Sequence, residues 1–221
     1  MSLAVFAVVL LAAAVHATWN ALLKGSGSML MRTIFVAATS GVASALVLPF
    51  VPAPDPECLP YLAASVLVQT GYYVLLANAY RVGDMSRTYP LMRGLAPVIV
   101  AIVSTVFLDE RIGALGWLGV ALGSLGIFSL VLAGRGGPPA RGTGFAVLNA
   151  ITIATYTMID GVGVRAAGSI AYVLWLFVLC GGVLAIYAVL TNRTLFLETI
   201  RATLPQGITA GLGNLASYAL V

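Results

Sequence analysis

The sequence predicts an all-α integral membrane protein. Of its 221 residues, 61% are hydrophobic and only 8% are charged, and the mean hydropathy is +1.05. Soluble domains usually carry about a quarter charged residues, so this chain has too few charges to cover a water-facing surface. Backbone groups in lipid must find their hydrogen-bond partners within their own segment. Helices are therefore the expected form of the apolar runs.

Apolar runs of membrane-crossing length recur along the whole chain. A crossing helix needs about 20 mostly apolar residues. Glycine, proline and charged residues separate the runs, and the short intervals are predicted as connections between antiparallel neighbours. The first run lacks the positive flank of a signal peptide, so we expect a retained helix. The eight predicted helices are Leu3–Leu23, Leu30–Phe50, Leu59–Tyr80, Met85–Leu108, Gly113–Ala133, Gly142–Val164, Ser169–Leu190 and Thr203–Val221.

The charges and cysteines exclude several classes of function. The net charge is +4, but the basic residues stand singly between apolar runs. This pattern is typical of membrane loops and not of a nucleic-acid surface. Cys58 and Cys180 are the only cysteines, and they indicate neither a disulfide framework nor a zinc site. No cofactor or metal is expected, and the sequence GxxxxGK[ST] of a nucleotide-driven pump is absent.

The helices are predicted to form two repeats. Residues 135–141 are rich in glycine and proline and are predicted to link a five-helix repeat, 1–134, to an incomplete repeat of three helices, 142–221. Ala17-Thr18-Trp19-Asn20 in the first predicted helix is similar to Ala154-Thr155-Tyr156-Thr157 in the sixth. Five is odd, so the repeats would be inverted, an arrangement typical of transporters. Chance similarity between apolar sequences is the alternative.

The basic residues also bear on orientation. One set of predicted loops carries most of them, and the other set carries several acids. The positive-inside rule then places the first set in the cytoplasm and the N-terminus outside. The basic residues of the first set are Lys24, Arg32, Arg81, Arg87, Arg135, Arg141, Arg193 and Arg201.

Polar side chains inside the spans are the candidate functional residues. Each is costly in lipid unless it is paired or hydrated, so such residues often line a substrate pathway. The alternative is a structural role, in which they bond to neighbouring helices or anchor at the interface. The candidates for a substrate cavity are His16, Trp19, Asn20, Gln69, Tyr73, Tyr89, Arg93, Tyr156, Asn214 and Tyr218.

Three of the ionisable residues have specific alternatives. Asp160 is the candidate proton or ion carrier within a span, unless it pairs with Arg165 at the interface. His16 is a second candidate for coupling because histidine takes up a proton near neutral pH. Arg93 would bind an anionic group of a substrate, or form an internal ion pair with Asp84 or Asp160.

Three stretches of the chain carry polar residues in a distinctive order: His16-Ala17-Thr18-Trp19-Asn20, Tyr80-Arg81-x-Gly83-Asp84-x-Ser86-x-x-Tyr89-Pro90-x-x-Arg93-Gly94-x-x-Pro97, and Leu108-Asp109-Glu110-Arg111. In order and spacing they resemble the EamA family of the drug/metabolite transporter superfamily. Asp109 stands where that family usually has glycine. The resemblance covers nearly the whole chain.

The resemblance implies ten helices in two inverted five-helix repeats around a central cavity, and export or exchange of small metabolites. This chain ends at Val221, after the eighth predicted helix, so we expect it to be an incomplete version of that pattern. The family also implies both termini in the cytoplasm, in conflict with the charge distribution. It supplies no universal substrate residues, so the candidates above rest on burial alone.

The leading hypothesis is a secondary transporter of a small polar or amphipathic metabolite, working by alternating access. We expect a multi-pass protein of the cell membrane, of the bacterial inner-membrane kind. Its partners would be the substrate and the lipid bilayer, with no nucleic acid, and a homodimer is left open. A membrane scaffold or accessory subunit is the alternative. An intramembrane enzyme is disfavoured, because the single histidine, His16, excludes an HExxH motif.

Overall fold

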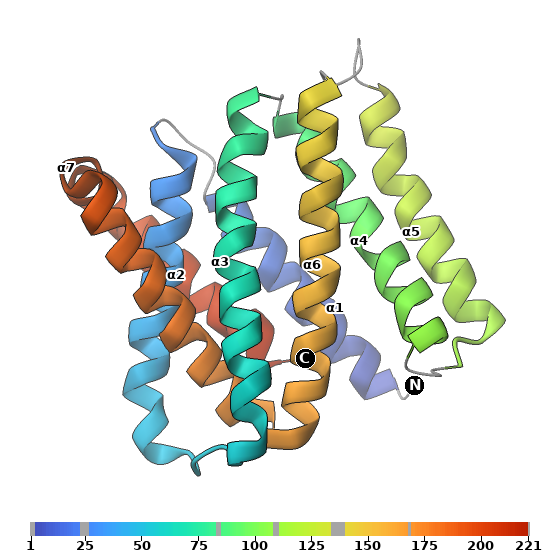
Figure 1. The fold of residues 1–221 in the computed structure, drawn as a ribbon, viewed down its shortest axis with the longest axis horizontal. Coiled ribbons are helices and arrows are strands. Elements are labelled where there is room, and N and C mark those ends of the chain that lie inside the picture. The colour runs from blue at the N-terminus through green and yellow to red at the C-terminus, as the bar shows by residue number, and fades with distance from the viewer. Residues whose placement is uncertain are drawn as a thin grey trace. The chain divides into compact units, whose positions relative to one another are not determined.

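A computed structural model of the chain describes residues 3–22, 27–82, 85–107, 111–133, 140–167 and 169–220 (Figure 1). These residues are helical nearly throughout and contain no strand, so the predicted all-α class is confirmed. The elements are α1 (Leu3–Leu22), α2 (Met29–Val47), the 3-10 turns η1 (Leu48–Phe50) and η2 (Pro56–Cys58), α3 (Leu59–Val82), α4 (Met85–Phe107), α5 (Ala114–Ala133), α6 (Ala140–Ala167) and α7 (Ser169–Ala219).

Several of these helices are long and apolar enough to cross a bilayer. By length and composition, five stretches of the described chain qualify: Met29–Phe50, Pro56–Leu76, Thr88–Phe107, Gly142–Ala166 and Ile170–Ala219. The described apolar parts of α1 and α5, Leu3–Trp19 and Ala114–Ser129, are shorter. The helices lie where the apolar runs predicted them. The count of eight spans and the inverted repeat remain predictions.

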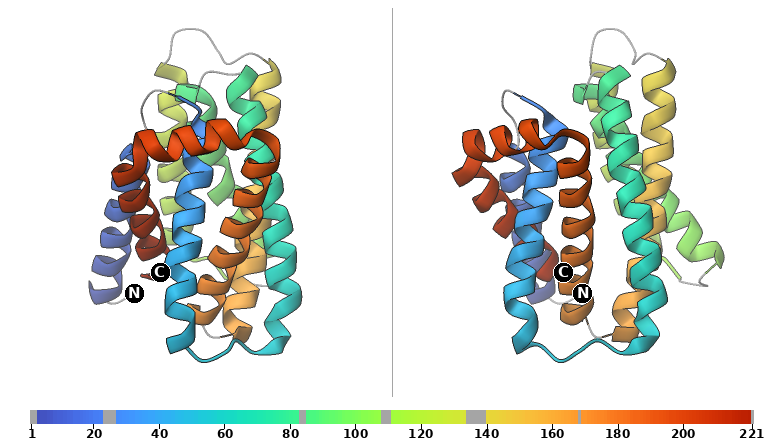
Figure 2. Two further views of the ribbon diagram at one scale, coloured as in Figure 1. Left: turned by 90° about the vertical axis from the view of Figure 1, so that its left-hand side faces the viewer. Right: turned by 60° about the vertical axis from the view of Figure 1, so that its left-hand side comes forward.

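Helix α7 corrects one predicted connection. The sequence predicts a connection at 191–202, but α7 is helical through this interval except at Asn192, and a second break follows at Thr203. These two residues divide α7 into a first limb, 169–191, a crosswise segment, 193–202, and a last limb, 204–219, and Figure 2 shows the crosswise segment running across the direction of the limbs. The Asn192 side chain accepts a hydrogen bond of 3.1 Å from the Leu195 backbone N–H. This is how an N-cap residue starts a helix.

Parts of three predictions lie outside the described residues. These are most of the predicted linker 135–141, the Leu108-Asp109-Glu110 part of the family motif, and the side chain of the cavity candidate Asn20.

The described chain packs into two compact units, which combine parts distant in sequence. Unit 1 consists of Met1–Leu62 and Gly163–Val221, and unit 2 of Ala63–Val162. Unit 1 therefore contains α1, α2 and α7, and unit 2 contains most of α3, α4, α5 and most of α6.

Helix α2 is the centre of unit 1. Glycines of α7 let the two backbones come close: a methyl group added at Gly181 would lie 2.5 Å from the carbonyl oxygen of Ala37, and one at Gly211 would lie 2.5 Å from Cβ of Thr39. Ala37 and Thr39 are two residues apart, about 200° around a helix. The two limbs of α7 therefore pack on different faces of α2.

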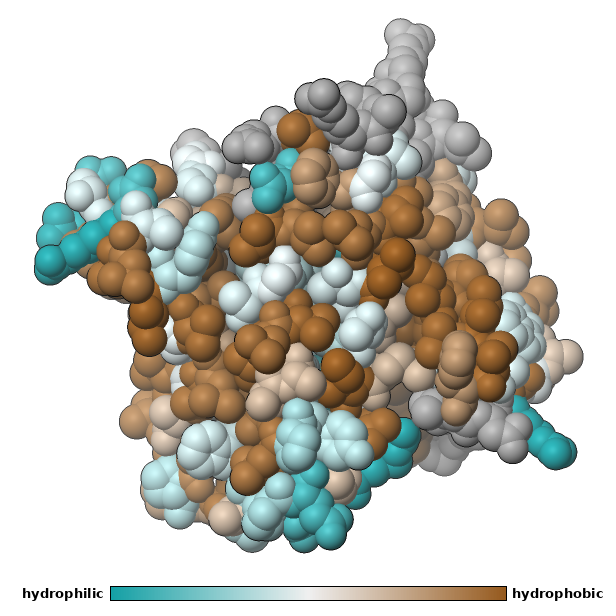
Figure 3. Space-filling view, in the orientation of Figure 1, coloured by the Kyte–Doolittle hydropathy of each residue, from teal (hydrophilic) through white to brown (hydrophobic). Residues whose placement is uncertain are grey.

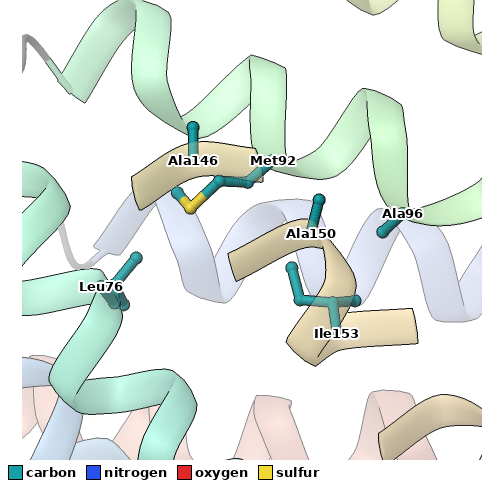
Figure 4. Packing of buried hydrophobic residues seen from close by; sticks show 6 residues of the cluster. All are labelled: Leu76, Met92, Ala96, Ala146, Ala150 and Ile153. Atoms are coloured by element: carbon teal, nitrogen blue, oxygen red, sulfur yellow. The ribbon is translucent and has the colours of Figure 1, made fainter. Parts of the chain in front are cut away.

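The core of unit 2 is built from α3, α4 and α6 (Figure 4). Small residues on α6 leave room for larger side chains from its neighbours, and Met92 of α4 is fully buried. Helix α5 joins α4 through the Ser124 hydroxyl, which donates to the carbonyl oxygen of Gly94 at 3.0 Å. The buried core residues are Leu76, Met92, Ala96, Ala146, Ala150 and Ile153.

Large apolar side chains are also exposed. Leu46, Leu67 and Leu190 are 70%, 74% and 80% exposed, and hydrophobic residues cover much of the face drawn in Figure 3. Such a surface would aggregate in water. It is the surface expected of helices that contact lipid chains.

The close approach of α2 and α7 makes a stability prediction. Gly181→Ala should lower the free energy of unfolding by about 1–3 kcal/mol, because the new methyl group overlaps the backbone of α2. Thermal unfolding of the full chain in detergent measures this. Gly182→Ala is the matched control: a methyl group there meets nothing within 4 Å, so it should be neutral or stabilise by up to about 1 kcal/mol. Equal destabilisation by both variants would contradict the packing.

Candidate functional site

A carboxylate inside an apolar span is the central feature of unit 2. The amide nitrogen of Gln69 on α3 donates to Oδ2 of Asp160 on α6 at 3.3 Å and to Oγ of Ser65 at 3.0 Å. Both Gln69 and Asp160 are half-buried. The structure thus brings together a predicted cavity residue and the predicted ion carrier, which are 91 positions apart in the sequence.

Tyrosine rings extend this group of polar residues. The Tyr72 ring lies edge-on to Tyr73 on the same helix, with ring centroids 5.2 Å apart. It also lies edge-on to Tyr156 of α6, with centroids 6.1 Å apart. Because Gln69 and Tyr73 are four residues apart on α3, they share a helix face. We call Gln69, Tyr72, Tyr73, Tyr156 and Asp160 the α3–α6 cluster.

Helix α4 presents a cation beside an aromatic ring. The Arg93 guanidinium lies over the Tyr89 ring, 5.5 Å from its centroid. This is within the range of a favourable cation–π contact. Tyr89 also packs against the core of unit 2. Asp84, one expected partner of Arg93, lies outside the described residues, and both expected roles of Arg93 remain predictions.

A second aromatic group surrounds the single histidine, in unit 1. The His16 ring lies edge-on to Trp19, with centroids 4.9 Å apart, and 6.2 Å from the ring of Tyr218 on the last limb of α7. Phe177 on the first limb lies edge-on to Tyr218 at 5.4 Å. His16, Trp19, Phe177 and Tyr218 form the His16 cluster, which unites three of the predicted cavity residues.

Trp19 is buried on one side of this cluster. It is 9% exposed and packs against Val36 and Ala210. Its indole N–H has no hydrogen-bond partner within the described part of the chain. An unsatisfied buried donor is costly. Trp19 therefore carries an unsatisfied buried donor beside the histidine.

Asn214 is engaged within the helix packing of unit 1. Its amide donates to the Ser40 hydroxyl at 3.1 Å, and that hydroxyl lies 2.9 Å from the carbonyl oxygen of Gly211 and 3.0 Å from that of Val36. Asn214 is 9% exposed and Ser40 is fully buried. The contact ties α2 to the last limb of α7. The predicted role of Asn214 in a cavity has no support in this geometry and remains a prediction.

The described residues contain no group of three or more His, Cys, Asp or Glu side chains that could hold a metal ion. The α3–α6 cluster instead combines a carboxyl group and an amide with tyrosine rings, and the His16 cluster combines an imidazole with aromatic rings. Side chains of these kinds can stack on and hydrogen-bond small polar or amphipathic molecules.

Comparison with known proteins identifies the family. A model of the EamA-like transporter family matches residues 3–132, more than half of the 221-residue chain. The chain belongs to the EamA-like transporter family. The predicted family resemblance is thereby confirmed, and the protein is a multi-pass membrane protein of a transporter family. Neither the curated proteins nor the solved structures give a match to the chain.

Some residues of these clusters were not predicted from the EamA-like sequence. The sequence predicts Tyr73 but not Tyr72 as a cavity residue, although both lie on α3 beside Gln69. Phe177 gave no signal, because one aromatic residue in an apolar span is unremarkable by composition. Asn149 was also missed: it is fully buried, and its amide donates to the Met92 sulfur at 2.9 Å. An asparagine in an apolar run is a signal that could have found it.

The Ser40–Asn214 contact gives a quantitative prediction. In a double-mutant cycle of Ser40→Ala and Asn214→Ala, the two changes should couple by about 0.6–1.7 kcal/mol, the range of hydrogen bonds between membrane helices. Thermal or denaturant unfolding of the full chain in detergent supplies the four free energies of unfolding.

The control for this cycle is Ser129→Ala. Ser129 is exposed, and its hydroxyl donates only to the Gly126 carbonyl of its own helix at 2.7 Å. Ser129→Ala should lower the free energy of unfolding by less than about 0.5 kcal/mol. This loss should simply add to the loss caused by Asn214→Ala. A coupling near zero between Ser40 and Asn214 would refute the bond between α2 and α7.

Proposed function

We propose that this EamA-like protein is a secondary transporter that exports or exchanges a small polar or amphipathic metabolite by alternating access. The observation that carries the proposal is the hydrogen bond between Gln69 and Asp160 within apolar spans. Family membership supports the general class of function, and the two clusters supply candidate contacts for the solute.

Asp160 is proposed as the residue that couples transport to a proton or cation. A carboxylate in lipid is costly, so such residues occur mainly where ions or substrates pass. The Gln69 amide donates to one oxygen of the carboxyl group and helps to hold it in place.

The aromatic rings are proposed to select the solute. Tyr72, Tyr73 and Tyr156 offer ring edges and hydroxyl groups on the two helices that carry Gln69 and Asp160. In unit 1, His16 and Tyr218 offer a similar combination beside the indole N–H of Trp19. Rings with polar tips favour molecules that have both an apolar body and a polar group. This matches an amphipathic metabolite better than a simple inorganic ion.

Flux measurements test the transport function. The full-length chain is reconstituted into lipid vesicles, and exchange of labelled amino acids, nucleosides, sugars and phosphonates is followed. We expect protein-dependent flux for at least one of these classes. Absence of flux for all of them, from vesicles that contain folded protein, would refute the proposal and favour a scaffold or accessory subunit.

The coupling role is tested by Asp160→Asn. It should reduce coupled flux by at least about tenfold, because the amide cannot carry a proton or bind a cation as a carboxylate does. Glu198→Gln is the matched control, since it removes one acid from the exposed face of the crosswise segment. Its flux should stay within about twofold of the original chain. Equal flux from both variants would exclude Asp160 as the coupling residue.

A further inference from the structure

Arg32 is a buried cation without a partner among the described residues. It lies in the first turn of α2, and its side chain is 7% exposed. Its Nη1 atom has no hydrogen-bond partner, and within the described part of the chain the guanidinium forms no hydrogen bond or ion pair. Removing a guanidinium from water is costly unless an anion or hydrogen-bond acceptors replace the water. The site is therefore incomplete without a ligand.

The arginine lines a hollow of unit 1. The hollow holds about 180 Å³ of empty space, its open mouth included, and its other walls include Phe35, Thr203, Gln206 and Gly207. The hollow is narrow because Gly207 lies against the Phe35 ring, where a side chain would overlap it. Its interior has room for little more than a water molecule, so a larger group could be held only at its open mouth.

The backbone beside the hollow also favours an anion. Thr203 has non-helical backbone angles, and the last limb of α7 begins directly after it. Gln206 and Gly207 therefore belong to the first turn of that limb. The first turn of a helix carries the positive end of the backbone dipole and attracts anions. The helix start and the unpartnered Arg32 thus act on the same hollow.

We propose that this hollow is a binding site for a phosphate group at the bilayer surface. An arginine fork matches the geometry of phosphate oxygens. The phosphate could belong to an anionic lipid headgroup or to a soluble phosphate compound. Both have the same chemistry, and the experiment below distinguishes them.

The charges of the crosswise segment indicate that the hollow lies at the membrane surface. All charged residues of α7 lie in this segment, at Arg193, Glu198 and Arg201, and all three are exposed. The limbs before and after it carry no charge. The segment therefore lies where lipid meets water, and Thr203 at its end brings the hollow to that level.

The wild-type chain decides the proposal in two arms. In the first arm, the thermal stability of the chain in a neutral detergent is measured at increasing concentrations of inorganic phosphate. Sodium chloride of equal ionic strength is the control. In the second arm, the chain is placed in phosphatidylcholine nanodiscs with or without phosphatidylglycerol, and retained lipids are counted by native mass spectrometry. A stability shift with phosphate indicates a soluble ligand. Retention of phosphatidylglycerol without that shift indicates a headgroup. The absence of both effects would overturn the proposal.

Two variants test the role of Arg32. Arg32→Gln should weaken binding in the responding arm by at least about tenfold, because it removes the charge-assisted hydrogen bonds. Arg201→Gln removes one exposed positive charge outside the hollow and should stay within about twofold. Equal losses from both would reduce the site to general electrostatic attraction and overturn it. If Arg32→Gln fails to fold, Arg32→Lys keeps the charge but loses the fork. Unchanged affinity for that variant would contradict bidentate binding.

Discussion

The close approach of α2 to both limbs of α7 determines the rest of unit 1. In lipid, apolar side chains gain little from leaving one apolar surface for another, so helices associate through tight packing and hydrogen bonds. Gly181 and Gly211 remove the side chains that would hold the backbones apart. Only at this separation does the Asn214 amide come within 3.1 Å of the Ser40 hydroxyl. The same packing places Tyr218 next to His16, and Gly207 against Phe35 beside the hollow.

Much of the fold could be predicted from the sequence, because the bilayer restricts the options so strongly. Length and hydropathy locate spans such as Leu59–Tyr80 within a few residues of α3 (Leu59–Val82). The same criterion fails at residues 193–202. That segment carries charges and looks like a loop by hydropathy, yet its cap at Asn192 and its buried Phe196 make it a helix. An amphipathic helix at a membrane surface is recognised by the helical periodicity of its apolar residues. The average hydropathy of the segment does not show this periodicity.

The candidate site was predictable only by residue type. A polar group inside a span is visible in the sequence, so His16, Gln69 and Asp160 could be selected. Which of them meet could not be predicted, because Gln69 and Asp160 are 91 positions apart and Ser40 and Asn214 are 174 apart. Contacts over such distances depend on helix order and rotation, which one sequence does not encode in any local pattern. Apolar members of the clusters such as Phe177 could not be predicted either, because an aromatic residue is common in an apolar span.

The buried polar residues fall into two chemical groups with different consequences. Ser40, Asn214 and Ser124 are uncharged and form hydrogen bonds to neighbouring helices, so each offsets its own desolvation and holds the fold together. Asp160 and Arg32 are ionisable or charged: Asp160 accepts a hydrogen bond from the Gln69 amide, and Nη1 of Arg32 has no hydrogen-bond partner among the described residues. A fold selected only for stability would replace such residues by apolar ones, because burial of charge is costly. The proposed ligands, a proton or cation at Asp160 and a phosphate group at Arg32, would account for their presence.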